Sequence, residues 1–203
     1  MISIRHLPPV TLALVAICVL VALASGFGQG QKVLQPLYIS ARFLHQLPEV
    51  KSGEYWRLLT PIFIHYGFIH LGLNMFALWI LGRAMEIQRR SLSLIILVIV
   101  TGVVSNLAEL WESGPRFGGM SGVLYGLFGY LWMQGRFNPK FGIHLPHSLI
   151  NALLIWFVIC WSGIFEYLLN VRFANMSHTA GLVTGIIWGF VSAKMESASL
   201  KKV

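Results

Sequence analysis

Aspartate is missing from this chain altogether, and charge of either sign is scarce. All seven acidic residues among the 203 are glutamate, and 11% of the residues are charged while 56% are hydrophobic. The lack of aspartate excludes a pair of catalytic aspartates, a phospho-aspartate intermediate and a Ser-His-Asp triad. With so little charge and a mean hydropathy of +0.72, the composition predicts a membrane protein.

Cysteines and basic residues add little information about function. Cys18 and Cys160 each lie within an apolar run, where a thiol behaves as a small hydrophobic side chain. The formal net charge of +8 reflects the few acidic residues, and no cluster of Lys and Arg alternates with aromatic residues. The sequence therefore predicts no nucleic-acid partner, and the basic excess is best explained by membrane orientation.

Six apolar stretches approach the ~20 residues that a helix needs to cross a bilayer core of ~30 Å. They leave no room for a soluble domain, so we expect a single all-α polytopic membrane domain over 1–203, a bundle of six transmembrane helices. The connection between the first two stretches mixes apolar and charged residues, which suits a first loop at the membrane interface. The predicted spans are 9–27, 67–85, 92–110, 119–134, 148–163 and 176–193.

Basic residues are distributed unequally between the two sides that six spans define. Both termini share one side, which carries nine basic and two acidic residues, whereas the other side carries six basic and five acidic residues. Because basic loops stay in the cytoplasm, we expect both termini to be cytoplasmic. A cleaved signal peptide is the alternative for the first span, since Arg5 precedes an apolar run that ends in Ala22-Leu23-Ala24.

Polar residues within the predicted spans are the candidates for function, because their burial in lipid is costly without a partner. Ser121 lies in the glycine-rich string 118–122, at the start of a span too short to cross, so we expect it to be recessed. The helical rise places Ser121 ~22 Å above the predicted cytoplasmic edge of the membrane, which the nearest charged residue marks. His70 and His178 lie ~24 Å above the same edge. Glycines at four-residue spacing favour close packing of the fourth and sixth spans, which would bring Ser121 to His178.

This pattern predicts a Ser121–His178 catalytic dyad, because a serine hydroxyl becomes a nucleophile when a base takes its proton. Glu109, near the outer end of the third span, could reach the histidine as a third member, but a two-residue dyad is the simpler prediction. The side chains of His70 and Asn74, four residues apart on one helix face, would stabilise the oxyanion. Backbone amides at the start of the fourth span, around Met120, would add to them. The predicted supporting residues are Tyr125, Gly119 and Gly122.

Other interpretations of these residues stay open. A serine among transmembrane glycines commonly serves packing alone, and a buried histidine commonly completes a core. His65, His70 and His178 could bind a metal, but no H-E-x-x-H pattern or aspartate completes such a site, so we predict no metal and no cofactor. A transporter would carry ionisable residues at mid-membrane, and the predicted spans have none there.

Five motifs occur in order along roughly 54–193, and together they resemble the rhomboid intramembrane serine proteases, most closely the compact six-span bacterial type. Ser177 departs from this resemblance, since the family usually has alanine before its histidine. The motifs are Glu54-x-Trp56-Arg57, His65-x4-His70-x3-Asn74, Ser113-Gly114-Pro115, Gly119-Met120-Ser121-Gly122 with Tyr125, and His178-x2-Gly181-x3-Gly185.

The resemblance implies an endopeptidase in a bacterial inner membrane, with Ser121 as nucleophile, His178 as general base, and His70 and Asn74 as oxyanion donors. Its substrates would be transmembrane proteins cut near the outer membrane surface, and lipid would be its other partner. The segment 163–175 would cap the site, and the fifth span would gate lateral access. A catalytically inactive relative that binds membrane proteins is the main alternative, ahead of a small transporter, and the sequence does not determine the oligomeric state.

Overall fold

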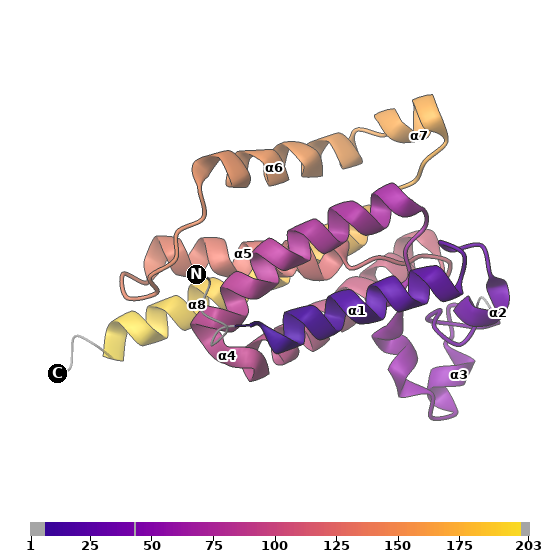
Figure 1. Ribbon diagram of the computed structural model, residues 1–203, viewed down its shortest axis with the longest axis horizontal. Coiled ribbons are helices and arrows are strands. Elements are labelled where there is room, and N and C mark those ends of the chain that lie inside the picture. Colours follow the sequence, from indigo (N-terminus) through magenta and orange to yellow (C-terminus); the bar gives the residue numbers. More distant parts are fainter. Residues whose placement is uncertain (1–6, 43, 200–203) are drawn as a thin grey trace.

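The computed structural model describes residues 7–42 and 44–199, in which every regular element is helical (Figure 1). Three of the nine basic residues counted on the side of the termini, Arg5, Lys201 and Lys202, lie outside the described residues. A helical segment lies at each of the six predicted stretches, although crossing of a bilayer by each stays a prediction. The long helices are α1 (Pro9–Ala24), α4 (Phe68–Ser113), α5 (Ser121–Phe137), α6 (His147–Trp161) and α8 (Asn175–Ser199).

The long helix α4 contains the second and third predicted spans. Arg90, with a φ of 69°, interrupts it and separates the two halves. Among the described residues, α4 is the one helix that is long and apolar enough by itself to span a membrane, and α1 and α6 are shorter apolar helices. Most of α5 is buried by other helices, which explains why its sequence contains glycine and polar residues in place of a lipid-facing surface.

The pair α5 and α8 packs through glycine. A Cβ atom added to Gly181 or Gly185 of α8 would overlap the carbonyl group of Gly122 or Gly126 of α5, so only hydrogen fits between the two backbones. Ser105 of α4 lies against the same Gly122. The close approach that the glycine spacing predicts is therefore confirmed, and it brings together the ends at which α5 and α8 begin.

A carboxylate of α4 caps the beginning of α1, where Pro8 provides no capping side chain. The Glu86 carboxylate accepts hydrogen bonds from the amides of Val10 and Thr11 and from the Thr11 hydroxyl, each at 2.8 Å. The Ser91 hydroxyl donates to the same carboxylate at 2.7 Å. Because the first amides of a helix lack partners within the helix, Glu86 fixes the position of α1 on α4.

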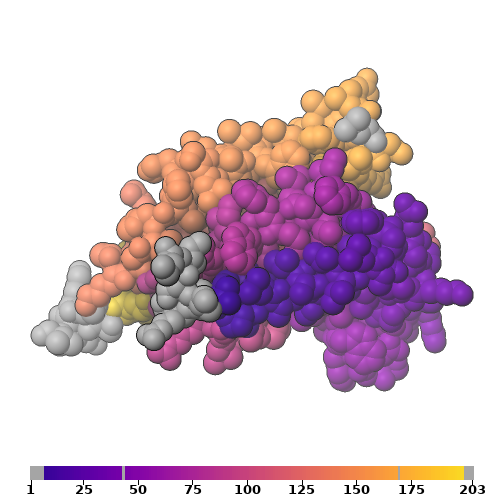
Figure 2. Space-filling model, viewed as in Figure 1, coloured from indigo at the N-terminus to yellow at the C-terminus, as the bar shows by residue number. Residues whose placement is uncertain are grey.

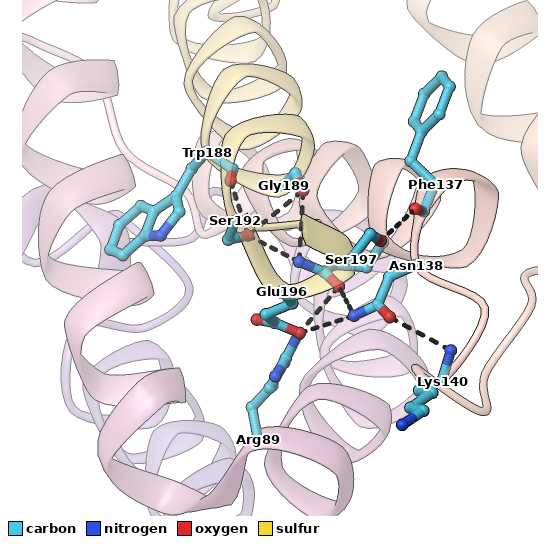
Figure 3. Close-up of polar contacts among 10 residues, drawn as sticks. Arg89, Phe137, Asn138, Lys140, Trp188, Gly189, Ser192, Glu196 and Ser197 are labelled. Carbon is cyan, nitrogen blue, oxygen red and sulfur yellow. Dashed lines mark hydrogen bonds and ion pairs between the residues drawn. The ribbon is translucent and has the colours of Figure 1, made fainter. Parts of the chain in front are cut away.

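At the end of the bundle away from Ser121, a polar network joins α4, α5 and α8 (Figure 3). Arg89 donates to the buried Gln134 at 2.9 Å and pairs with Glu196 at 2.7 Å. Gln134 in turn donates to the Ser192 hydroxyl at 2.6 Å, and Asn138 donates to Glu196 at 2.6 Å. The network satisfies buried polar groups of three helices at once, so it holds their ends in fixed register.

Short helical turns make up the first loop, between α1 and α4. Arg57 holds them together, because its guanidinium pairs with Glu54 at 2.7 Å and donates to the carbonyls of Gln35 and Tyr38 at 2.7 and 3.0 Å. The position of this loop at a membrane interface stays a prediction. The turns are α2 (Gln31–Leu34), α3 (Pro48–Lys51), and the 3₁₀ helices η2 (Tyr55–Leu58) and η3 (Thr60–Phe63).

The helix α6 lies apart from the other long helices, and α7 (Ile164–Leu169) continues along the same side of the molecule (Figure 1). Figure 2 shows this segment along one edge, with part of α4 visible between it and α1. The buried residues of α6 are Ile150 and Cys160. Tyr125 of α5 makes one polar attachment by donating its hydroxyl to the Leu153 carbonyl at 3.1 Å. Because α6 packs loosely, a space remains between it and the neighbouring helices, and α6 forms one wall of that cavity.

Candidate active site

Ser121 and His178 meet where α5 and α8 begin. The Nε2 atom of His178 lies 2.8 Å from the Oγ atom of Ser121. Both helices reach this point because their glycines allow the backbones to touch below it. A serine hydroxyl that donates to an unprotonated Nε2 leaves the imidazole proton on Nδ1, which is the state that a general base needs.

The aromatic ring of Tyr125 orients the His178 imidazole. The two ring centroids lie 4.9 Å apart, with planes inclined by 39°, and the Tyr125 hydroxyl is itself held by the Leu153 carbonyl at 3.1 Å. In the described part of the chain, the buried Nδ1 of His178 has no hydrogen-bond partner. Within the described residues, Ser121 and His178 therefore contact each other without a carboxylate at Nδ1.

His70 and Asn74, at the beginning of α4, lie beside the loop that carries Ser121. The Tyr66 amide donates to Nδ1 of His70 at 3.3 Å, so the imidazole proton lies on Nε2, where it can be donated. Asn74 donates to the His70 carbonyl at 2.8 Å and lines the same cavity as Ser121. Nε2 of His70 thus lies beside Gly119 of the loop, and Asn74 lies in the wall of the cavity that Ser121 also lines.

The loop before Ser121 requires glycine at position 119. Gly119 has a φ of +136°, and a Cβ atom there would lie 2.9 Å from Nε2 of His70 and 3.7 Å from Oγ of Ser121. Its amide donates to the Pro61 carbonyl at 3.1 Å. Only glycine combines that backbone conformation with such an approach. At Gly122, a Cβ atom would collide with the Ser105 side chain, so this glycine lets α4 approach the site.

Met120 has a partner that the sequence did not indicate. Its amide donates to Nε2 of His65 at 3.5 Å, and Nδ1 of His65 lies 3.2 Å from the Phe63 carbonyl. These contacts define a neutral His65 with its proton on Nδ1, and burial lowers the pKa of His65 to about 4. The oxyanion role predicted for the Met120 amide would require this hydrogen bond to break.

The geometry around His65 bears on the alternative of a metal site at His65, His70 and His178. The rings of His65 and His70 lie 5.1 Å apart, and both ring nitrogens of His65 face backbone groups. Within residues 7–42 and 44–199, no group of three or more His, Cys, Asp or Glu side chains is arranged to hold a metal ion.

The spacing of residues in the sequence could not indicate the structural role of His65, because the Met120 amide that it accepts from lies 55 residues away.

A cavity of about 280 Å³ extends from the dyad between α4 and α6. Asn74, Ser121 and His178 line it at the polar end, where the chemistry would take place. The remaining walls are almost entirely apolar and come from α4, α5 and α6. They include Ile80, Leu81, Leu124, Leu149, Leu153 and Trp156.

The fold and the site together define a helical protein in which a half-buried serine contacts a buried histidine beside an apolar cavity between α4 and α6. The family model of the rhomboid domain matches residues 52–195, and the chain therefore belongs to the rhomboid family, as its motifs predict.

Similar proteins include those named rhomboid protease GlpG of Salmonella choleraesuis (strain SC-B67), Salmonella newport (strain SL254) and Salmonella typhimurium (strain LT2). The chain is 36% identical to each of them over 183 residues, which is 90% of this chain. It spans 63% of the length of these relatives.

Proposed function

We propose that this chain is an intramembrane serine endopeptidase that cleaves transmembrane protein substrates by a Ser121–His178 dyad. The 2.8 Å contact between the serine Oγ and the histidine Nε2 carries the proposal, because a neutral imidazole at that distance can accept the hydroxyl proton. The name of the similar proteins, rhomboid protease, supports the same activity.

The reaction would begin when Nε2 of His178 takes the proton of Ser121 and Oγ attacks the carbonyl carbon of the substrate. The new C–O bond leaves a negative charge on the substrate oxygen, which Nε2–H of His70 and the Asn74 amide would stabilise. The C–N bond then breaks, and the leaving amine takes the proton from His178. Water then attacks the ester carbonyl while His178 takes its proton, the C–Oγ bond breaks to release the acid product, and His178 returns the proton to Oγ of Ser121.

Substrate access in this proposal is lateral, between α4 and α6. Both helices contribute apolar side chains to the cavity wall, which suits a segment that arrives from lipid. The hydrogen bonds of a helical substrate must open locally before its carbonyl is exposed to Ser121. In a bacterial inner membrane with six spans and cytoplasmic termini, the site would lie near the outer surface, and 163–175 would cap it.

The main alternative function is that of a rhomboid relative that binds membrane proteins without cutting them. Such a protein has no need to keep a serine hydroxyl in hydrogen-bond contact with an imidazole, so the contact favours the enzyme. A small transporter would need ionisable groups along a path through the bundle, and the cavity between α4 and α6 is lined almost entirely by apolar residues.

A fluorophosphonate probe tests the proposal, because only an activated serine reacts with it. We expect the purified protein to be labelled and to cut a reporter transmembrane substrate, whereas Ser121→Ala and His178→Ala should lose both properties and remain folded. Ser162→Ala, at the exposed end of α6, serves as the control and should behave as wild type. Labelling of Ser121→Ala at the wild-type level would refute the assigned nucleophile.

A further inference from the structure

The helix that carries His178 begins without a capping side chain of its own. The His178 amide donates to the Ala174 carbonyl at 3.1 Å, which makes Ala174 the N-cap residue of α8. An N-cap side chain normally accepts hydrogen bonds from the second or third helical amide, here Met176 or Ser177. Alanine has no oxygen to offer, so these amides need an acceptor from another part of the chain.

Glu109 of α4 provides that acceptor. Its Oε2 atom accepts from the Ser177 amide at 3.0 Å, and the Met176 amide and Ser113 hydroxyl interact with the same carboxylate. Glu109 is 1% exposed, so water does not compete for these hydrogen bonds. The carboxylate also lies at the positive end of the α8 dipole, where an anion is favoured.

The arrangement repeats what Glu86 does at the beginning of α1, where Pro8 likewise offers no side-chain cap. The two caps differ in what they hold. Glu86 fixes a helix that contributes nothing to the candidate site, whereas Glu109 holds the amide of Ser177, the residue directly before His178.

We propose that Glu109 is a positioning residue, which caps the first turn of α8 and thereby keeps His178 within hydrogen-bond distance of Ser121. The inference rests on the proposed function. Loss of the cap would let the first turn of α8 move, and a displacement of about 1 Å in a catalytic group can cost ~10²-fold in rate. Ser121 and the α4 and α6 walls of the cavity should keep their positions, since the hydrogen bonds of Glu109 hold the first turn of α8.

The test compares the rate of fluorophosphonate labelling, kcat, KM and thermal unfolding for a set of variants of the whole chain. Glu109→Leu should be labelled ~10²-fold more slowly, with a matching fall in kcat and an unchanged KM. Glu109→Gln keeps an acceptor oxygen on a stem of the same length, so it should remain within a few-fold of wild type. Ala174→Ser, added to Glu109→Leu, gives α8 its own capping oxygen and should recover much of the lost rate.

Glu112→Leu is the matched control, because Glu112 lies three residues along the same helix and is exposed. It should be labelled at the wild-type rate. If Glu109→Leu does not fold, Glu109→Asp replaces it in the comparison with wild type, because the aspartate side chain is one methylene shorter.

Two results would contradict the proposal that Glu109 positions His178 by capping α8. One is a Glu109→Leu protein labelled as fast as wild type, and the other is a Glu109→Gln protein as slow as Glu109→Leu with no recovery from Ala174→Ser. Folded wild-type protein that takes no label would instead contradict the proposed function itself, so the two failures are distinguishable.

Discussion

Three histidines surround the loop that carries Ser121, and a different hydrogen bond sets the proton position of each. Nε2 of His178 contacts the serine hydroxyl and would be unprotonated in the state that accepts its proton, whereas the Tyr66 amide leaves the proton of His70 on Nε2. His65 faces backbone groups with both nitrogens. Under the proposed function, one residue type would therefore serve as base, donor and structural support within a single site, with the local hydrogen bonds of each histidine deciding its role.

Single substitutions should separate the oxyanion donors from the dyad by magnitude. We expect His70→Ala and Asn74→Ala each to lower kcat by ~10²–10³ while leaving measurable turnover, because the other donors still stabilise the charge. KM should change little, since the charge develops after substrate binds. Steady-state cleavage of a reporter substrate by the folded variants measures this. Wild-type rates in both variants would mean that the two residues only pack in α4.

Glu49, a buried residue of the first loop, should make stability depend on acid pH. Burial by itself would raise the pKa of Glu49, but hydrogen bonds from backbone amides, including that of Arg42 at 2.8 Å, and from the Ser40 hydroxyl at 3.0 Å hold it below its usual value. A lowered pKa in the folded state adds stability that is present above the unfolded pKa and is lost as pH falls through the folded pKa.

Thermal unfolding across acid pH measures this contribution from Glu49. The melting temperature of wild type should fall as pH drops below 4.5, and Glu49→Gln should start lower and show a flatter dependence. Parallel curves for the two proteins would rule out a contribution from this carboxylate.

At the scale of helices, the contact between α5 and α8 depends on hydrogen at the glycine positions. Gly185→Ala should destabilise the protein by ~1–3 kcal/mol, because the new methyl group would overlap the Gly126 carbonyl. Gly72→Ala in α4 is the matched control, since nothing lies within 4 Å of its added Cβ. It should be neutral or slightly stabilising. Thermal unfolding in detergent compares the two, and equal melting temperatures would contradict the close contact.

At the scale of the whole molecule, the start of α1 and the end of α8 lie toward one end, and the first loop and α7 lie toward the other (Figure 1). The Gly119 amide bonds to Pro61 of η3, so the dyad lies toward the first-loop end. The network of Arg89 and Glu196 holds the opposite end (Figure 3). The site is therefore closer to one end of the bundle, which under the predicted orientation is the outer one.

Cysteine accessibility tests that orientation in intact cells. A cysteine that replaces Arg116 should react with an impermeant maleimide from outside, and one that replaces Lys140 should react only after lysis, because the excess of basic residues predicts cytoplasmic termini. The native Cys18 and Cys160 are buried, so background labelling should be low. The reverse pattern would show that the protein is inserted the other way.

The positions of the helices, and the serine and histidine that meet, could be predicted from the amino-acid sequence. Both follow from local information, since apolar run length and glycine spacing act through residues of one helix and its immediate neighbour. Apolar run length predicts a span and not the end of its helix: α8 continues to Ser199, past the predicted span 176–193, because polar residues in a last helical turn resemble a loop in composition.

The partners that complete the site could not be predicted from the sequence, because they come together through tertiary packing. Met120 meets His65 across 55 residues, Ser177 meets Glu109 across 68, and Thr11 meets Glu86 across 75. Tertiary packing also separates α6 from the other helices and so creates the cavity. A hydrogen bond between distant residues depends on how whole helices pack, and hydrophobic pattern and propensity describe one segment at a time. The buried glutamates at 86 and 109 were visible in the sequence, but the amides that they cap were not.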